Sequence, residues 1–331
     1  MRRLTRFEFL KAAAVTGAGA AFLAACGGKT PGALGGAGSG GAPAVARDDA
    51  AAVPSPRAGR PAPGPGADSV VVAEGPSASA NVERAVTALG GMGAFAKSGD
   101  VVVVKPNIVH AMAPQYAVTT DPDVVATLVR LALAAGARQV LVMDNPAGGL
   151  PQNTYAASGI AAAVAAAGGT MQIMSDSEYA DYVIPGHLLK VHPIYRAIAD
   201  ADVLINVPIA KQHGSTGLTL AGKNMMGATS DRGRMHRAGL SQSIAELNAA
   251  LCPDLSVIDA TRILVRNGPS GGSMRDVNIK DTIIAAADWV AADAYATRLF
   301  GKTPAEVPYI KAAADMHLGS MDLPATKIRN V

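Results

Sequence analysis

The sequence predicts an α/β fold: a mainly parallel sheet with helices on both faces, doubly wound and Rossmann-like. Two observations predict it. Short β-branched runs alternate with longer segments of helical periodicity, and the runs are apolar throughout. Strands that are apolar on both sides are typical of sheets covered on both faces. Strand–helix–strand units of this length join parallel neighbours through right-handed crossovers.

The expected elements follow in a regular order. Strands are expected at 69–73, 100–105, 139–144, 171–174, 201–208, 255–259 and 282–286, and helices at 80–89, 121–136, 155–167, 240–251 and 289–300. The second helix is the clearest, because Thr120 or Asp121 can cap its start and Gly136 can end it. The segment 218–226 also has helical character.

The N-terminal residues 1–26 have the pattern of a signal peptide. A basic start precedes an uncharged stretch at 12–25, which is too short to span a bilayer. The tetrapeptide ending at Cys26 resembles the bacterial lipoprotein box, so we expect a lipid on Cys26 that anchors the exported protein in the periplasm or cell envelope. The segment 5–11 resembles a twin-arginine export motif, but Phe7 replaces the second arginine, which leaves folded and unfolded export both open.

Residues 27–67 are rich in Gly, Ala and Pro and predict a disordered tether, followed by one α/β domain at 68–331. The chain has only two cysteines, Cys26 and Cys252. A lipidated Cys26 leaves no disulfide and no cysteine-ligated iron–sulfur cluster, and we interpret Cys252 as a buried, inert thiol. The net charge of +3, with five Phe, seven Tyr and one Trp, gives no basic block interleaved with aromatics, which argues against nucleic-acid binding.

Polar residues cluster where the expected strands end, and they predict a binding site. Lys105 and Asn107 follow one strand, Asp144 a second, and Asp259 ends another. Ligands of open α/β sheets bind beyond the carboxyl ends of the strands. Thr120 caps a helix whose free amides can also hold an anion. Each residue alone is equally compatible with capping or turn formation.

The segment 211–227 carries the densest set of candidates. It contains several cationic and amide side chains and no carboxylate, namely Lys211, His213, Thr216, Lys223 and Asn224. This composition suits an anionic small molecule that carries a carboxylate or phosphate. Crowded lysines depress one another's pKa values, so Lys211 or Lys223 can act as a base or form an imine. His213 is a candidate general acid or base.

Two further loops carry candidates with weaker patterns. Arg232, Arg234 and His236 form either a solvated turn or a lid over an anion. Asn267 lies in a turn-rich loop that matches neither nucleotide-binding glycine motif. We interpret the remaining histidines as structural: His110, His187, His192 and His317.

Several of these segments together resemble the DUF362 (domain of unknown function 362) family. They are 104–108, 119–122, 202–208, 211–227, 232–236, 253–259 and 267–272, and the resemblance spans about Lys105 to Asp293. The resemblance implies no settled activity. Many members carry ferredoxin-like clusters, whose cysteines this chain lacks, so electron transfer is not implied here. It supports a shared site formed by Lys105, Asn107, Lys211, His213, Lys223 and Asn224.

Three functions remain compatible with the sequence. The favoured one is an enzyme that acts on an anionic small molecule through Lys, His and Asn side chains. One alternative is a non-catalytic binding lipoprotein for an anionic solute. The other is a metal-cofactor-dependent enzyme using His213, His236 and Asp259 or Asp144, although the spacing gives no defined metal ligand set. The Lys- and His-bearing loops distantly resemble those of nickel-cofactor lactate racemases, which is an analogy of fold.

Overall fold

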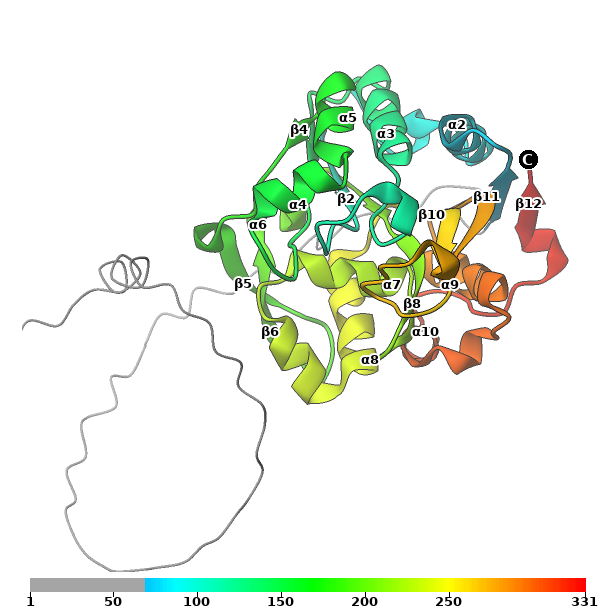
Figure 1. Ribbon diagram of the computed structural model, residues 1–331. Helices are drawn as coiled ribbons and strands as arrows, with labels where there is room; N and C mark the ends of the chain where they lie inside the picture. The colour runs from blue at the N-terminus through cyan, green and yellow to red at the C-terminus, as the bar shows by residue number, and fades with distance from the viewer. Residues whose placement is uncertain (1–68) are drawn as a thin grey trace, which may run out of the picture. The chain divides into compact units, whose positions relative to one another are not determined.

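A computed structural model describes residues 69–331 (Figure 1). The predicted signal peptide, the tether and Cys26 lie outside the described residues, so those predictions stay predictions. Within 69–331, no helix combines the length and the apolar character needed to cross a membrane.

The described chain is built on a mixed, mainly parallel sheet. Its main path runs in the order β12 (Ile328–Asn330), β1 (Val70–Glu74), β11 (Val277–Ala286), β10 (Leu255–Leu264), β7 (Val203–Val207), β2 (Val101–Pro106), β3 (Gln139–Val142) and β4 (Thr170–Met171). Strand β11 is antiparallel to both neighbours, and the other pairs on this path are parallel. This arrangement confirms the predicted fold class.

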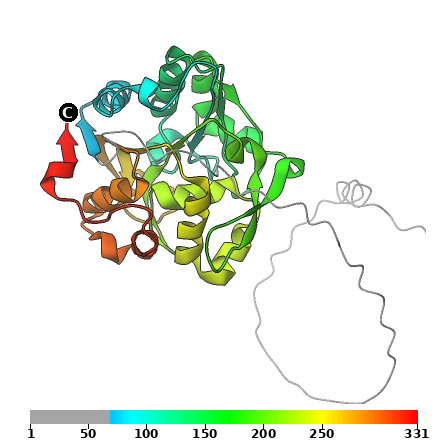
Figure 2. The ribbon, with the colours of Figure 1, turned by 180° about the vertical axis from the view of Figure 1, so that it is seen from behind.

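Helices cover both faces of the sheet (Figure 1; Figure 2 shows the reverse view). One layer holds α2 (Ala78–Ala88), α3 (Pro122–Ala134), α4 (Pro151–Ala157) and α5 (Ile160–Ala166); the other holds α7 (Ala221–Asn224), α8 (Arg232–Leu251), α9 (Trp289–Ala296) and α10 (Pro308–Asp315). Successive strand residues point to opposite layers. Val102 and Val104 join the core under α2 and α3, and Val103 joins the core under α8 and α9.

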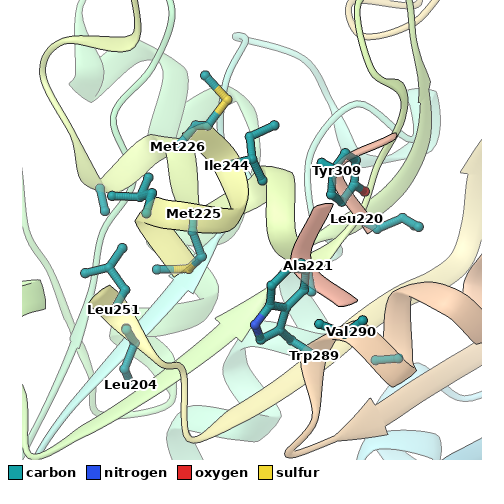
Figure 3. Packing of buried hydrophobic residues seen from close by; sticks show 14 of the residues in the cluster. Leu204, Leu220, Ala221, Met225, Met226, Ile244, Leu251, Trp289, Val290 and Tyr309 are labelled. Atoms are coloured by element: carbon teal, nitrogen blue, oxygen red, sulfur yellow. The ribbon is translucent and has the colours of Figure 1, made fainter. Parts of the chain in front are cut away.

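The short helix α7 is fixed by close packing and by a buried carboxylate. Figure 3 shows Ala221 beside Trp289 and Val290, with Tyr309 and Met225 nearby. A side chain at Gly222 would lie 3.0 Å from the Tyr309 ring and even closer to Trp289, so only glycine fits this approach. Asp293 accepts hydrogen bonds from the N–H groups of Ala221 (2.6 Å) and Gly222 (2.9 Å). These contacts fix the position of the next residue, Lys223.

Most predicted elements are confirmed, and the differences have local causes. Asp121 caps α3, as one of the two predicted alternatives. The expected helix at 155–167 is two helices, because Gly159 adopts a positive φ of 74° between them. The polar segment that begins at Lys211 is a hairpin, in which β8 (Ile209–His213) pairs with β9 (Gly217–Thr219). Helix α8 begins at Arg232 and has its kink at Gly239 (φ 127°).

Other segments were not anticipated from the sequence. They are the hairpin of β5 (Tyr179–Val183) and β6 (Val191–Tyr195), the one-turn helix α6 (Arg196–Ala199), helix α10 and strand β12. The interpretation of Cys252 as buried is wrong. Cys252 is exposed and ends α8 in a left-handed conformation (φ 39°), where its thiol donates to the carbonyl of Ala249 at 3.1 Å.

Candidate functional site

The candidate site lies where the chain reverses its direction of winding. From β2 the chain passes through α3 to β3 on one side, and from β7 it passes through α7 and α8 to β10 on the other. Because α3 and α8 cover opposite faces, the carboxyl ends of β2 and β7 border a crevice, the usual ligand position in such sheets. A cavity of about 450 Å³ opens here, lined by Asn107, Val109, His110, Asp144, Ala147, Lys211, His213, Thr219, Lys223, Asn224, Met226, Gly227, Arg232, His236, Pro269 and Ser270.

The base of the cavity is a buried ion pair. The Lys105 ammonium donates to Asp144 Oδ1 at 2.7 Å, and both side chains are inaccessible to solvent. The second oxygen, Asp144 Oδ2, accepts the N–H of Ile108 at 2.6 Å. Burial lowers the pKa of Lys105, and the Asp144 carboxylate opposes that effect. The pair is approached by the backbone of Gly227, where a Cβ would overlap Asp144 Oδ1 and lie 2.7 Å from the Lys105 nitrogen.

Two asparagines join this pair to a second lysine. Asn107 Nδ2 donates to Asn224 Oδ1 at 2.9 Å, and Asn224 Nδ2 donates to Asn206 Oδ1 at 2.8 Å. The Lys211 ammonium donates to Asn107 Oδ1 (3.0 Å) and to the carbonyl of Val118 (2.7 Å). We call Lys105, Asn107, Asp144 and Asn224 the floor of the cavity. Each member has a hydrogen-bonding partner within it, which keeps the floor rigid.

Lys223 has a different environment from the other two lysines. The residue is 9% exposed, and its ammonium donates to the thioether of Met226 at 3.2 Å, a weak acceptor. Burial and then the charge of Arg232 lower the pKa of Lys223 to about 8. Within residues 69–331, neither Lys223, Lys211 nor Arg232 has a carboxylate within 4.0 Å. We call Lys223 and Arg232 the cationic wall; His213 lines the same cavity.

The titration of the lining groups follows from burial and from mutual repulsion. Burial lowers the pKa of Lys211 to about 7; Asp144 raises it, and Lys223 and Lys105 lower it further. Burial, then the charges of Lys223 and Lys211, lower the pKa of His213 to about 3. His213 is therefore neutral at physiological pH. Its Nδ1 accepts the N–H of Ser215 at 3.1 Å, which assigns its proton to Nε2.

One lining residue has a buried polar atom without a partner. Thr219 lies opposite Lys211 in the β8–β9 hairpin and is 3% exposed. In the described part of the chain its hydroxyl has no hydrogen-bond partner. Buried hydroxyl groups are normally paired, and this one is available to hydrogen-bond a ligand in the cavity.

Most sequence-predicted candidates come together at the cavity. Its lining includes Asn107, Asp144, Lys211, His213, Lys223, Asn224, Arg232 and His236, and Lys105 lies directly beneath. The sequence-based interpretation of His110 as a structural residue does not fit its position, because His110 lines the cavity. His110 lines the rim, with Nε2 3.2 Å from Ser270 Oγ, and burial lowers its pKa. Other lining residues not anticipated from the sequence are Val109, Ala147, Thr219, Met226, Gly227, Pro269 and Ser270.

Two predicted binding residues instead support the framework behind the site. Thr120 Oγ1 accepts the N–H of Asn107 (2.9 Å) and donates to the carbonyl of Val207 (2.7 Å), which ties β2 to β7. Asp259 lies within β10 and does not end a strand. Its carboxylate accepts the N–H of Asp121 at 2.7 Å and two donors of Thr261. Neither side chain lines the cavity.

Three more predicted residues also do not line the cavity. Thr216 donates to the carbonyl of Leu218 at 2.9 Å within its own hairpin. Arg234 donates to the carbonyls of Leu189 and Val191, both at 2.8 Å. Asn267 donates to Asp276 at 2.7 Å across the base of its loop. The sequence pattern did not separate these residues from their neighbours. Arg232 and Arg234, for example, are two positions apart in α8 and therefore point to roughly opposite sides of the helix.

The donors proposed for a metal centre do not form a ligand set in the described residues, although His213, His236 and Asp144 line the same cavity. Between residues 69 and 331, no three His, Cys, Asp or Glu side chains gather in a way that could hold a metal ion. Asp259 is engaged with the N-terminus of α3, and Asp144 is paired with Lys105.

The fold and the cavity define an α/β protein with a cation-lined site at the switch point of a mainly parallel sheet. The chain belongs to the family described as Domain of unknown function (DUF362), whose profile matches residues 102–298. It is similar to the thylakoid-associated protein sll1697 of Synechocystis sp., with 29% identity over 247 residues, 72% of this chain and 75% of that protein. Among solved structures it is similar to a lactate racemase apoprotein from Thermoanaerobacterium thermosaccharolyticum (TM-score 0.41, 13% identity), over 69% of this chain and 56% of that one.

Proposed function

We propose that this protein is an exported lipoprotein whose α/β domain is an enzyme acting on a small carboxylate or phosphate. The observation that carries the proposal is the charge balance of the cavity. Lys211, Lys223 and Arg232 line it, while the one carboxylate among the described lining residues, Asp144, is already paired with Lys105. Buried charges without a counter-charge are unfavourable, so a bound anion would supply the missing partner.

The polar groups that line the cavity would divide between anion binding and proton transfer. Lys223 and Arg232 would hold the anion, and the orphaned Thr219 hydroxyl would donate a hydrogen bond to it. Lys211, with a pKa of about 7, can exchange a proton near neutral pH, as a general acid or base requires. Neutral His213, protonated on Nε2, would donate a hydrogen bond; it would not act as an imidazolium acid.

Calorimetric titration of the full-length protein with sulfate and with malonate tests the anion site. We expect Lys223→Met to weaken both anions at least about tenfold, the loss of roughly 1.4 kcal/mol that one charge-assisted contact contributes. Lys280→Met, which removes an exposed lysine on β11, should bind as the wild type does. Unchanged affinity in Lys223→Met, with the fold intact, would place the anion site elsewhere.

The export and anchoring part of the proposal comes from the sequence of residues 1–26. If Cys26 carries a lipid, the wild-type protein should fractionate with membranes and Cys26→Ser should appear in the soluble fraction. Equal membrane association of both proteins would contradict a lipid anchor at Cys26.

A further inference from the structure

The three lysines at the cavity differ in how free their side-chain nitrogens are. Lys105 is inaccessible and bound to Asp144 at 2.7 Å. Lys211 is 1% exposed and held by two oxygen acceptors. Lys223 is the most accessible of the three at 9%, and its nitrogen contacts a thioether. Of the three, Lys223 is therefore the one whose nitrogen can turn toward a ligand without breaking a strong hydrogen bond.

The surroundings of Lys223 favour loss of its proton. Burial and then the charge of Arg232 lower its pKa to about 8, so a larger fraction of Lys223 is uncharged near neutral pH than in an exposed lysine. Met226 and the backbone of Gly227 complete the adjacent wall and bring no negative charge. A neutral lysine nitrogen keeps its lone pair and is a nucleophile toward carbonyl groups.

We propose that Lys223 condenses with the carbonyl group of an anionic aldehyde or ketone, such as a 2-oxo acid, to form an imine. The inference rests on the proposed function: protonated Lys223 would hold a simple anion together with Arg232, whereas with a carbonyl ligand Arg232 would hold the carboxylate or phosphate and Lys223 would react in its uncharged form. The Lys223 nitrogen would attack the carbonyl carbon while the carbonyl oxygen takes up a proton, giving a carbinolamine. Loss of that oxygen as water, with one proton from the nitrogen, would leave the C=N bond. No oxidant or reductant is consumed.

The neighbouring groups have defined parts in this step. The Nε2–H of His213 would donate to the carbonyl oxygen and make its carbon more electrophilic. The Thr219 hydroxyl would donate to the same ligand, since it has no partner among the described residues. Lys211, fixed by Asn107 and Val118, would supply and recover the protons.

Reductive trapping of the full-length protein tests the proposal. Pyruvate, glyoxylate and dihydroxyacetone phosphate are each added with sodium borohydride, and the product is analysed by intact mass and peptide mapping. We expect a single adduct on Lys223 with at least one carbonyl compound, and none when the borohydride is omitted. Carboxylated and phosphorylated probes show which anion the site takes. Malonate in excess should suppress the adduct by occupying the same cavity.

Two variants separate condensation from charge. Lys223→Arg keeps a cation that binds malonate within a fewfold of wild type but has no amine to condense, so its adduct should vanish. Lys280→Met should be labelled as fully as the wild type. Malonate binding without any trapped adduct would overturn the imine and leave the anion site standing. If the wild-type protein neither binds malonate nor gives a trapped adduct, both the anion site and the imine are overturned. An adduct spread over exposed lysines would overturn the proposal of an imine at Lys223.

Discussion

The floor and the cationic wall of the cavity are built from the same residue types but differ in how their charges are compensated. In the floor, Lys105 is paired with Asp144, and the asparagines complete one another's hydrogen bonds. In the wall, Lys223 and Arg232 face the cavity with no carboxylate within 4.0 Å among the described residues. A buried lysine is therefore not evidence of function by itself; the missing partner is what indicates a ligand.

The floor should be the most sensitive part of the site to substitution. Asp144→Ala would leave the Lys105 ammonium buried without its counter-charge and Ile108 N–H without its acceptor. We expect the free energy of unfolding to fall by about 3–5 kcal/mol, as when one partner of a buried pair is removed. Urea unfolding measures this loss.

A surface ion pair gives the matched control. Lys311 and Asp315 lie 2.6 Å apart on α10, and each side chain is more than half exposed. Asp315→Ala should lower the free energy of unfolding by less than about 1 kcal/mol. Equal losses in the two variants would mean that the Lys105–Asp144 pair is not desolvated as described.

Lys223→Met should have an effect on stability that depends on pH. Lys223 has a pKa of about 8 when folded, against its usual 10.5. Between these values the unfolded chain binds more protons than the folded one, so wild-type stability rises with pH across this range. Below pH 8 the variant should be the more stable by on the order of 2–3 kcal/mol, because it buries no cation. The advantage should shrink to nothing near pH 10.5.

Parallel urea titrations of both proteins at several pH values between 7 and 10.5 measure this difference. Comparing the two proteins cancels the groups that they share. A stability difference that stays constant with pH would show that Lys223 titrates normally, and the cationic wall would then be better solvated than its burial indicates.

The close packing of η4 (Met225–Ala228) against the floor can be tested by substituting Gly227. Gly227→Ala would place a methyl group against Asp144 and Lys105, so the substitution would have to displace the buried ion pair. We expect a loss of about 1–3 kcal/mol in unfolding free energy, together with weaker sulfate binding. Gly93→Ala is the control, because a Cβ there meets nothing within 4 Å.

The sequence predicted the sheet better than it predicted the site. The strand expected at 100–105 and the helix cap expected at Thr120 or Asp121 depend on local patterns; the structure has β2 at Val101–Pro106 and the cap at Asp121. Asp259 was misplaced because β10 continues for five residues beyond it, a length fixed by pairing with β11. Thr219 carries no motif. Its importance arises only when the β8–β9 hairpin places it beside Lys211.

The pairing and the orientation of the charged site residues likewise depend on tertiary contacts that a local sequence pattern does not contain. Lys105 and Asp144 each followed an expected strand, but their pairing requires parallel strands β2 and β3 to be neighbours. Arg232 and Arg234 looked equivalent in sequence. Because α8 begins at Arg232, Arg232 faces the cavity, whereas Arg234 faces the carbonyls of Leu189 and Val191.

The smallest effect on anion affinity is expected for a substitution that keeps the positive charge and changes only the geometry of the hydrogen-bond donors. In Arg232, Nη2 donates to the carbonyl of Pro146 at 3.2 Å, which positions the guanidinium at the cavity. Arg232→Lys would keep the charge but lose the planar donors that match a carboxylate, so malonate should bind about fivefold more weakly, roughly 1 kcal/mol. Arg234→Lys should leave the affinity unchanged, because that guanidinium is engaged outside the cavity. If calorimetry finds equal losses in both variants, the wall acts through long-range charge and not through contact.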